Sequence, residues 1–433
     1  MNNDIIFALS SGHGKSGVAV IRVSGNNLRD MFARISGKKS FDARKTYLIN
    51  MRDTAGDLID QCLVIYFAAP NSFTGTDIIE IHSHGAPAVI ERIFTYLSET
   101  FGARMATPGE FSRRAFYNNK MDLADIDGLA ALLDATTDRQ RRAALQSMTG
   151  YDSQIYNDWR GQMIEISAYA AAMLDYEPDD LPKNIGDTLR ARTQKLYDEI
   201  SSALASTRRA RAIRGGYNIV LVGDPNVGKS SIFNRIVGSN RAIVSDIAGT
   251  TRDVVSASLD IDGYFVNLSD TAGLRDDASD EIEKIGIERT NMEMQNADLI
   301  IRVFTNKVKV NYQPNQIIVI NKSDLLSEKT NKNIIYVSAK TGDGMDKLMD
   351  AIRDKIHHDL SGAETQVAIN NRTRMLLTDA CDALKNALDL SSNNYDIFTE
   401  HVRIAADSIG KILGTITASE VLDATFGQLC LGK

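Results

Sequence analysis

Cysteine is scarce in this chain. Three cysteines occur among 433 residues, and Cys62, Cys381 and Cys430 lie far apart in the sequence. This spacing matches neither a zinc-binding motif nor a disulfide framework, and it is typical of proteins in a reducing compartment. We therefore expect a cytoplasmic location and no zinc site built on cysteine.

Long hydrophobic runs are missing as well. The apolar run at residues 5–9 is short and no basic stretch precedes it, so it predicts a buried strand and no signal peptide. No apolar segment is long enough to span a bilayer, and we expect no membrane partner.

The chain also lacks a basic surplus. It carries 49 Lys and Arg against 56 Asp and Glu, which gives a net charge of -7. Nonspecific binding of nucleic acid depends on an excess of Lys and Arg, so the net charge disfavours a general nucleic-acid coat protein. It does not exclude a local basic patch. The hydrophobic fraction of 43% is ordinary for a globular protein. The length predicts roughly two to four domains.

The texture of the sequence changes three times along the chain. Up to about residue 122 it predicts a mixed α and β domain, with strands at residues 5–9, 17–23, 62–67 and 78–82 and a helix at 89–97 after Pro87. Helical composition follows to about residue 213, where an apolar stripe predicts packing between helices. The stripe comprises Leu189, Leu196, Ile200 and Leu204.

From Tyr217 strands and helices alternate, which is the pattern of a doubly wound, mostly parallel sheet. Helical texture returns after about residue 365, with Leu377, Ala380, Leu384 and Leu388 on one face. The simplest architecture is an α/β domain inserted into a helical domain made from both flanks, since the ends of a domain often lie close together. The expected ranges are 1–120 for the N-terminal domain, 121–213 and 365–433 for the helical domain, and 216–360 for the inserted domain.

The inserted domain contains the motif Gly223-Asp-Pro-Asn-Val-Gly228-Lys229-Ser230 between an apolar run and a helical stretch. This strand–loop–helix context is what a phosphate-binding loop requires, because backbone N–H groups and the helix N-terminus surround the phosphates. Lys229 is expected to reach the β- and γ-phosphates, and Ser230 to bind magnesium. The segment Gly12-His-Gly-Lys-Ser-Gly17 also contains Gly-Lys-Ser, but Leu9 replaces the required first glycine, so we expect a turn there.

Three further motifs follow in order, each after a predicted strand. Asp270-Thr-Ala-Gly273 suits magnesium and the γ-phosphate, and Asn321-Lys-Ser-Asp324 suits guanine. The Asp324 carboxylate can accept hydrogen bonds from the ring N–H and exocyclic amine of guanine, whereas adenine would leave the charge unpaired. Ser338-Ala-Lys340 is expected to support the base. Together the motifs predict a GTPase.

The residues that activate water are less obvious. Many small GTPases carry a water-orienting Gln directly after the Asp-x-x-Gly motif, where this chain has Leu274. From the residues alone, several charged groups or a bound ion remain candidates for orienting water and neutralising charge. The candidate carboxylates are Asp276, Asp277, Asp280, Glu281 and Glu283, and the candidate cations are Arg252 and Arg275.

Longer motifs extend beyond the GTPase set. The inserted domain shows Asp246-Ile-Ala-Gly-Thr-Thr-Arg-Asp253, Asp270-Thr-Ala-Gly-Leu-Arg275 and Ile285-Gly-Ile-Glu-Arg289. The N-terminal part shows Asn71-Ser-Phe-Thr-Gly75, Ala106-Thr-Pro-Gly-Glu-Phe111 and Arg114-Ala-Phe-Tyr-Asn118, and the chain ends Cys430-Leu-Gly-Lys433. Over essentially its whole length the sequence resembles the MnmE (TrmE) family of tRNA-modification GTPases.

The resemblance implies a fold and a function. The implied fold is a P-loop GTPase domain inserted into a helical domain, with an N-terminal α+β domain that binds folate and dimerises the protein. The implied function is GTP hydrolysis coupled to tRNA modification. With the flavoprotein MnmG, in an expected heterotetramer, such proteins add a carboxymethylaminomethyl or aminomethyl group to carbon 5 of the wobble uridine. The one-carbon unit comes from a 5-formyl- or methylene-tetrahydrofolate.

The resemblance also implies site residues. Folate would contact Arg22, Glu80, Lys120 and Lys433, and Cys430 is a candidate catalytic thiol. Potassium would bind Asn226, Ser245, Ile247 and Thr250, while magnesium would bind Ser230 and Thr251. Glu283 would orient the attacking water and act with Lys229 in catalysis, although an extra residue near 276–279 leaves Glu281 as the alternative. The remaining implied GTP contacts are Val227, Gly228, Ser231, Asp246, Ala248, Gly249, Asp270, Thr271, Ala272, Gly273, Asn321, Lys322, Asp324, Ser338, Ala339 and Lys340.

Two other functions fit the GTPase motifs alone. An assembly GTPase could act on ribosomes or RNA without one-carbon chemistry, and a structural nucleotide-binding protein would show no turnover. The N-terminal motifs and the last four residues favour tRNA modification. Binding of a reduced folate would separate it from the assembly GTPase.

Overall fold

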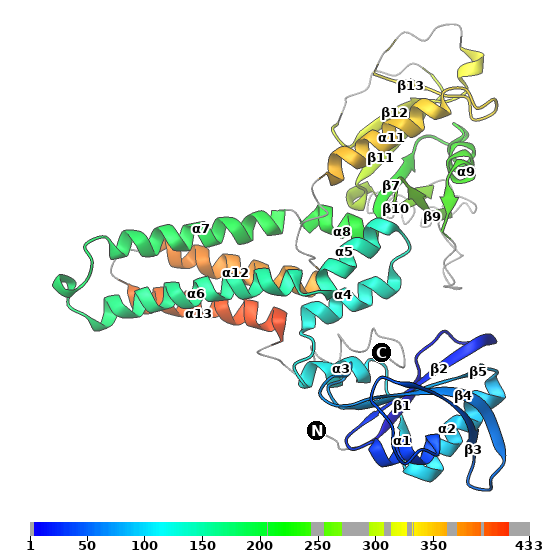
Figure 1. Ribbon diagram of the computed structural model, residues 1–433. Coiled ribbons are helices and arrows are strands. Elements are labelled where there is room, and N and C mark those ends of the chain that lie inside the picture. The colour runs from blue at the N-terminus through cyan, green and yellow to red at the C-terminus, as the bar shows by residue number, and fades with distance from the viewer. Residues whose placement is uncertain are drawn as a thin grey trace, which may run out of the picture. The chain divides into compact units, whose positions relative to one another are not determined.

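The computed structural model describes residues 4–205, 207–243, 255–270, 294–306, 313–326, 331, 333–361, 370–390 and 394–414. The chain divides into two compact units. Unit 1 comprises Met1–Ala130 and Ile409–Lys433, and unit 2 comprises Ala131–Ser408. Unit 1 contains a sheet with flanking helices, and unit 2 contains a long helical part and a second sheet (Figure 1). Among the described residues, no helix has both the length and the apolar composition needed to cross a membrane.

The sheet of unit 1 has six strands in the order β3-β4-β5-β2-β1-β6. Neighbouring strands are antiparallel, except that β1 and β6 run parallel. The strands are β1 (Ile6–Leu9), β2 (Ser16–Gly25), β3 (Thr46–Arg52), β4 (Leu58–Phe67), β5 (Asp77–Gly85) and β6 (Arg104–Met105), and the helices are α1 (Arg29–Ser36), α2 (Pro87–Phe101) and α3 (Glu110–Tyr117).

Alternation along the strands gives this sheet two different faces, because successive side chains of a strand point to opposite sides. Ile21 and Ile81 point into a core that includes Phe32 of α1 and Leu97 of α2. The opposite face carries the pair Arg22 and Glu80, which are register partners in β2 and β5. Further along the sheet this face also carries two exposed leucines, Leu48 of β3 and Leu63 of β4. One side of the sheet is therefore a packed core, and the other is partly open.

The predicted elements of this region are confirmed, but helices α1 and α3 and strands β3 and β6 had not been predicted. Strands form at all four predicted places, and helix α2 starts at Pro87, where the missing N–H costs nothing. The turn expected around residues 12–17 is present, although β2 already begins at Ser16. Strand β3 was not predicted. Its neighbouring apolar residues Leu48 and Ile49 lie on opposite faces, 62% and 7% exposed, which hides the alternation.

A cluster of ion pairs ties the start of α3 to the edge of this sheet. Arg104 Nη2 lies 2.6 Å from Glu110 Oε1, and Arg114 Nη2 lies 2.9 Å from Asp4 Oδ1. Burial alone would raise the pKa of Glu110, but hydrogen bonds from Arg104, the Thr107 N–H and Arg114 outweigh it and lower the pKa to about 2. The carboxylate is thus ionised over the whole physiological range.

The helical part of unit 2 is built from long amphipathic helices. Helix α7 packs against both α6 and α12, and the three run side by side in Figure 1. The predicted stripes lie inside this packing, since Leu196, Ile200 and Leu384 are fully buried. The helices are α4 (Leu123–Asp134, which begins in unit 1), α5 (Asp138–Met148), α6 (Tyr151–Asp175), η1 (Pro178–Asp180), α7 (Ile185–Ala205), α8 (Thr207–Gly215), α12 (Asn371–Asp389) and α13 (Tyr395–Leu413, which ends in unit 1).

The second sheet, which lies in unit 2, has seven strands in the order β13-β12-β11-β7-β10-β9-β8. The five strands from β13 to β10 are parallel, and the two at the β8 edge are antiparallel, so the predicted mostly parallel sheet is confirmed. Strands β8, β9 and β11 had not been predicted. The elements are β7 (Tyr217–Val222), α9 (Lys229–Ser239), β8 (Arg241–Ala242), β9 (Val255–Ile261), β10 (Tyr264–Asp270), β11 (Leu299–Phe304), β12 (Gln316–Ile320), η3 (Ser323–Leu325), β13 (Ile335–Tyr336) and α11 (Met345–Leu360).

Candidate nucleotide-binding site

The four nucleotide motifs lie at one edge of the second sheet. The phosphate loop follows β7, and Asp270 ends β10. Asn321 follows β12, and Ser338 lies just beyond β13. These four strands are parallel, so their carboxyl ends meet at the same edge, where open α/β sheets bind ligands.

The phosphate loop has the backbone that its sequence predicts. Asn226 and Gly228 are left-handed, with φ of 63° and 94°, and α9 begins directly after Gly228. A Cβ atom at Gly228 would lie 2.2 Å from the Asn321 side-chain nitrogen, so only glycine fits there. The N-terminus of α9 is therefore available to an anion.

Lys229 is folded over this loop. Its side chain is buried, and Nζ donates hydrogen bonds to the carbonyl oxygens of Gly223 at 2.9 Å and Asp224 at 3.0 Å. Both acceptors are neutral. A phosphate oxygen would form a stronger, charge-assisted bond with the ammonium group.

The structure brings together Ser230 and Asp270, the two described residues expected near magnesium. Ser230 Oγ donates a hydrogen bond of 2.7 Å to Asp270 Oδ2, and Asp270 is only 1% exposed. A hydroxyl and a carboxylate are the hard oxygen donors that Mg²⁺ prefers, usually with retained waters and phosphate oxygens. These residues fit a magnesium ion.

Asn321 joins the guanine motif to the other two loops. Its Nδ2 donates to the Val227 carbonyl at 2.8 Å, and its Oδ1 accepts from the Ala339 N–H at 3.0 Å. Lys322 Nζ adds a bond of 3.0 Å to the Asn226 carbonyl. The phosphate loop and the loop at residues 338–340 are thus held through one buried amide side chain.

Asp324 is exposed at the same edge, on the short helix η3. A hydrogen bond from Ser338 is the main cause that lowers the pKa of Asp324 below its ordinary value, with a smaller contribution from the Lys340 charge. Ser338 itself is fully buried. A guanine base placed here would meet an ionised acceptor, as its N–H and amino groups require.

Several predicted residues lie outside the described part of the chain. The Mg²⁺ candidate Thr251, the K⁺ candidates Ser245, Ile247 and Thr250, and both water candidates, Glu281 and Glu283, are among them. The others are Asp246, Ala248, Gly249, Thr271, Ala272, Gly273, Cys430 and Lys433, together with Arg252, Leu274, Arg275, Asp276, Asp277 and Asp280.

Two of the folate candidates of unit 1, Arg22 and Glu80, are adjacent. Arg22 donates to Glu80 through Nε at 3.2 Å and Nη2 at 2.9 Å. Lys120 is exposed and follows a turn that contains Asn118. Asn118 Nδ2 donates a hydrogen bond of 2.6 Å to the Thr74 carbonyl, which holds this turn against the segment after Phe73. A guanidinium group and an ammonium group suit the carboxylates of a folate, and Glu80 can accept from a pterin N–H. The residues present therefore fit such a ligand.

Three neighbours of this pair had not been predicted. The Arg22 guanidinium lies 5.4 Å from the ring centroid of Phe73 and 6.0 Å from that of Phe111, and His82 Nε2 lies 3.5 Å from Glu80 Oε2. Both phenylalanines belong to the N-terminal motifs of the sequence, which was the available signal. His82 gave none, because its place beside Glu80 follows from strand alternation in β5.

The two described cysteines are not nucleophiles. Cys62 and Cys381 are buried, and burial raises the pKa of their thiols to about 12 and about 11. A buried thiol with a raised pKa is inert.

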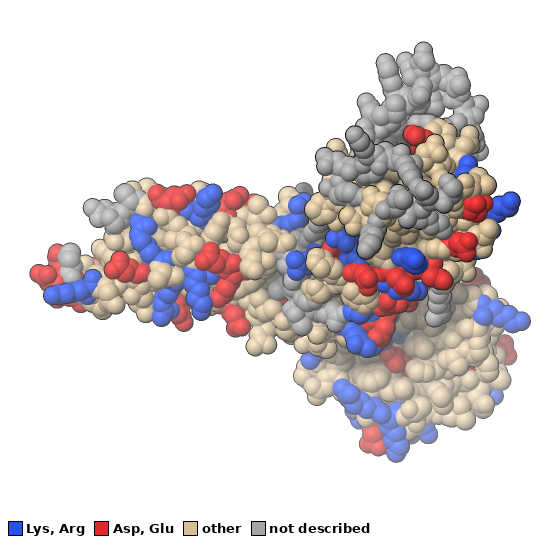
Figure 2. Space-filling model, turned by 90° about the horizontal axis from the view of Figure 1, so that it is seen from above, with Lys and Arg blue, Asp and Glu red and all other residues tan. Residues whose placement is uncertain are grey.

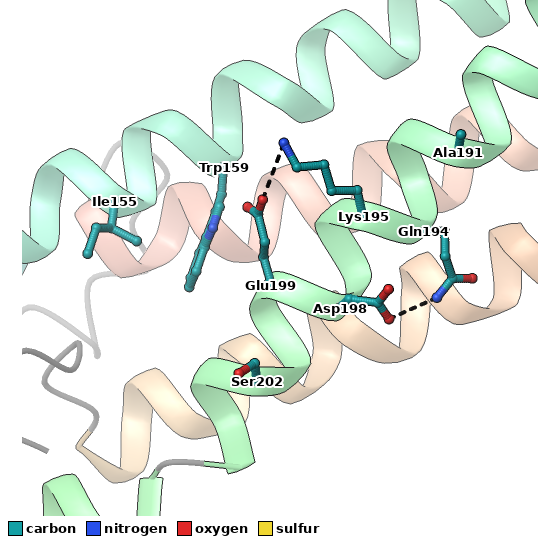
Figure 3. A pocket seen from close by; sticks show the side chains of 8 residues that line it. All are labelled: Ile155, Trp159, Ala191, Gln194, Lys195, Asp198, Glu199 and Ser202. Carbon is teal, nitrogen blue, oxygen red and sulfur yellow. Dashed lines mark hydrogen bonds and ion pairs between the residues drawn. The ribbon is translucent and has the colours of Figure 1, made fainter. Parts of the chain in front are cut away.

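A groove of about 910 Å³ lies in the helical part of unit 2, between α6 and α7. Trp159 and Ile155 of α6 form one wall, and Lys195 and Glu199 of α7 form an ion pair on the other (Figure 3). It carries none of the predicted residues. On the face shown in Figure 2, basic and acidic side chains of the described residues are mixed, as the composition suggests.

Comparison with known proteins covers the whole chain. The family model described as MnmE helical domain matches residues 123–430, and the one described as GTP-binding protein TrmE N-terminus matches residues 5–120. A curated protein of Rhizobium johnstonii, named tRNA modification GTPase MnmE, is 38% identical, with 100% of both chains covered. Proteins of the same name from Agrobacterium fabrum and Brucella anthropi are 38% and 37% identical over at least 98% of each chain.

Proposed function

The chain belongs to the MnmE family of tRNA modification GTPases, and from this membership we propose that it hydrolyses GTP to support modification of tRNA. The proposed reaction adds a carboxymethylaminomethyl or aminomethyl group to carbon 5 of the wobble uridine, together with the flavoprotein MnmG. The supporting observation is the position of Asn321. Its side chain joins the phosphate loop to the loop beside the base, so one sheet edge can hold a whole guanine nucleotide.

In the proposed nucleotide site each motif has a separate task. Lys229 leaves the Gly223 and Asp224 carbonyls to bind the β- and γ-phosphates. Ser230 and Asp270, already in contact, hold and orient the magnesium shell. Asp324 selects guanine, since adenine would leave its carboxylate without donors.

Two further parts of the hydrolysis proposal rest on family membership. Glu283 orients the attacking water, with Glu281 as the alternative. Asn226 contributes to a potassium site, and a monovalent cation there would supply the positive charge that an arginine finger supplies elsewhere. Asn226 lies in the phosphate loop and has a left-handed backbone, with a φ of 63°.

The one-carbon chemistry is assigned to unit 1. Arg22, Glu80 and Lys120 contact a tetrahydrofolate derivative, with Glu80 accepting from its pterin ring and Lys120 binding a carboxylate. Lys433 completes the set, and Cys430 is kept as a candidate thiol. The bound folate would supply the one-carbon unit.

We also propose that the protein is a homodimer joined through unit 1. The partly open face of the sheet bears Leu48 of β3 and Leu63 of β4, which are register partners and 62% and 41% exposed. Exposed leucines paired on one face of a sheet favour an apolar partner surface. A second copy of the same face provides one with two-fold symmetry.

The proposed domain ranges remain 1–120, 121–213, 216–360 and 365–433, and the proposed location is the cytoplasm. The decisive experiment is mass spectrometry of wobble nucleosides from cells that lack the protein. Loss of the modified uridine, restored by the wild-type chain, is the expected result. An unchanged nucleoside profile would reject the proposal in favour of an assembly GTPase.

A further inference from the structure

Arg235 links the helix after the phosphate loop to the loop beside the base. Helix α9 buries Ile232 and Ile236 against the core of the second sheet, and Arg235 lies on its exposed side. The guanidinium Nε donates to the Ala339 carbonyl at 2.7 Å, and Nη2 donates to the Lys340 carbonyl at 2.8 Å.

The geometry of this contact is specific to an arginine. Two N–H groups of one planar guanidinium reach two consecutive carbonyl oxygens, which a lysine ammonium cannot do with the same geometry. The turn at Gly342, which follows Lys340, leaves room for the guanidinium group. Gly342 has a φ of 98°, and a Cβ atom there would lie 2.9 Å from Arg235 Nη1.

The contact is independent of the bonds made by Asn321. Asn321 holds the 338–340 loop through the Ala339 N–H, whereas Arg235 holds the carbonyls of Ala339 and Lys340. The first turn of α9 carries Lys229 and Ser230, so Arg235 connects the phosphate-binding helix directly to the base-supporting loop.

We propose that Arg235 is a positioning residue for the bound guanine nucleotide. It fixes the distance between the groups that bind the phosphates and the loop that supports the base. Loss of the contact lets the loop move away from the base, and the nucleotide dissociates faster. This inference rests on the proposed guanine site.

The alternative is that Arg235 only stabilises the fold, as an exposed arginine on a helix can. The two roles differ in what they change. A stabilising role lowers the unfolding temperature of the nucleotide-free protein. A positioning role changes the nucleotide dissociation rate and leaves that temperature in place. Neither Ala339 nor Lys340 is expected to touch the γ-phosphate, so hydrolysis of prebound GTP should not change.

The test uses the full-length protein and a fluorescent GDP analogue. Arg235→Ala should raise the dissociation rate roughly three- to ten-fold, the scale of a charge-assisted hydrogen bond at a partly solvated site. Arg235→Lys should give an intermediate rate, because it can restore one bond. Single-turnover hydrolysis of prebound GTP and the unfolding temperature without nucleotide should match the wild type. Arg353→Ala, which removes a half-buried arginine of α11 in the same domain, is the matched control and should dissociate like the wild type.

Three outcomes would overturn the inference. They are a wild-type dissociation rate in Arg235→Ala, a rate increase matched by Arg353→Ala, and a fall in the unfolding temperature of the nucleotide-free protein. Failure of Arg235→Ala to fold counts as the last of these. Failure of the guanine site itself is recognised separately, since the wild type would then bind adenine and guanine nucleotides alike.

Discussion

The guanidinium carbon of Arg139 lies 4.0 Å from the ring centroid of Tyr264. Arg139 belongs to helix α5, and Tyr264 opens strand β10 of the second sheet. Tyr264 follows the turn between β9 and β10, which contains Asp262. Helix α11 also holds this turn, because His357 Nε2 lies 3.2 Å from Asp262 Oδ2. The β9–β10 turn is thus fixed on both sides, and α5 belongs sequentially to the helical region that precedes the GTPase motifs.

This contact should contribute measurably to the stability of unit 2. Arg139→Ala removes a cation–π interaction of about 0.5–2 kcal/mol, and the free energy of unfolding in urea should fall by that amount. Arg141→Ala on the same helix is the control. Arg141 makes an exposed ion pair with Asp138, a type of contact worth about 0–1 kcal/mol. Equal effects of the two substitutions would show that the Tyr264 contact adds nothing.

Asp324 should determine the base preference. Asp324→Asn reverses the polarity of one hydrogen bond, so GTP affinity should fall on the order of ten- to a hundred-fold while xanthosine triphosphate affinity rises. Titration with both nucleotides measures the change. Asp346→Asn alters an exposed carboxylate of α11 and should leave both affinities alone. A GTP preference that survives Asp324→Asn would contradict the guanine assignment.

Potassium should accelerate hydrolysis. Leu274 takes the place where many GTPases have a water-orienting Gln, and Asn226 lies in the phosphate loop with a left-handed backbone. At equal ionic strength, replacing K⁺ by Na⁺ should slow GTP turnover strongly. Asn226→Ala should remove the difference between the two salts and leave nucleotide binding largely intact. If the wild type turns over equally fast in both salts, the proposed ion site does not act in hydrolysis.

The sequence was sufficient where a site is local in the chain. The phosphate loop, Asp270, Asn321 and Asp324 each follow a strand with a clear apolar run, and parallel strands bring their ends to one edge. Contacts between distant segments gave no such signal. Arg235 and Ala339 are 104 residues apart, and Arg139 and the Asp262 carbonyl are 123 apart. Their pairing depends on how helices pack on the sheet, which no local pattern encodes.

Arg22 and Glu80 show the same limit inside one sheet. Both are ordinary charged residues in strands, 58 residues apart, and only the register of β2 against β5 makes them partners. Family resemblance named them as folate candidates, and the structure shows that they form a two-bond ion pair beside two aromatic rings.

The ion pair leads to the last prediction, on folate binding. Arg22→Ala should weaken binding of a reduced folate, because a charge-assisted contact is lost, and should leave GTP affinity unchanged, because the nucleotide motifs lie in unit 2. Calorimetric titration with 5-formyl-tetrahydrofolate and with GTP on the same preparation measures both.

Arg113→Ala is a suitable control, since Arg113 lies in α3 and is not among the predicted folate residues. It should bind folate like the wild type. Deleting residues 430–433 should mimic Arg22→Ala in this assay if Lys433 completes the site. Full folate affinity in both the Arg22→Ala and the truncated protein would leave unit 1 with dimerisation as its only proposed role, and the assembly GTPase would become the better hypothesis.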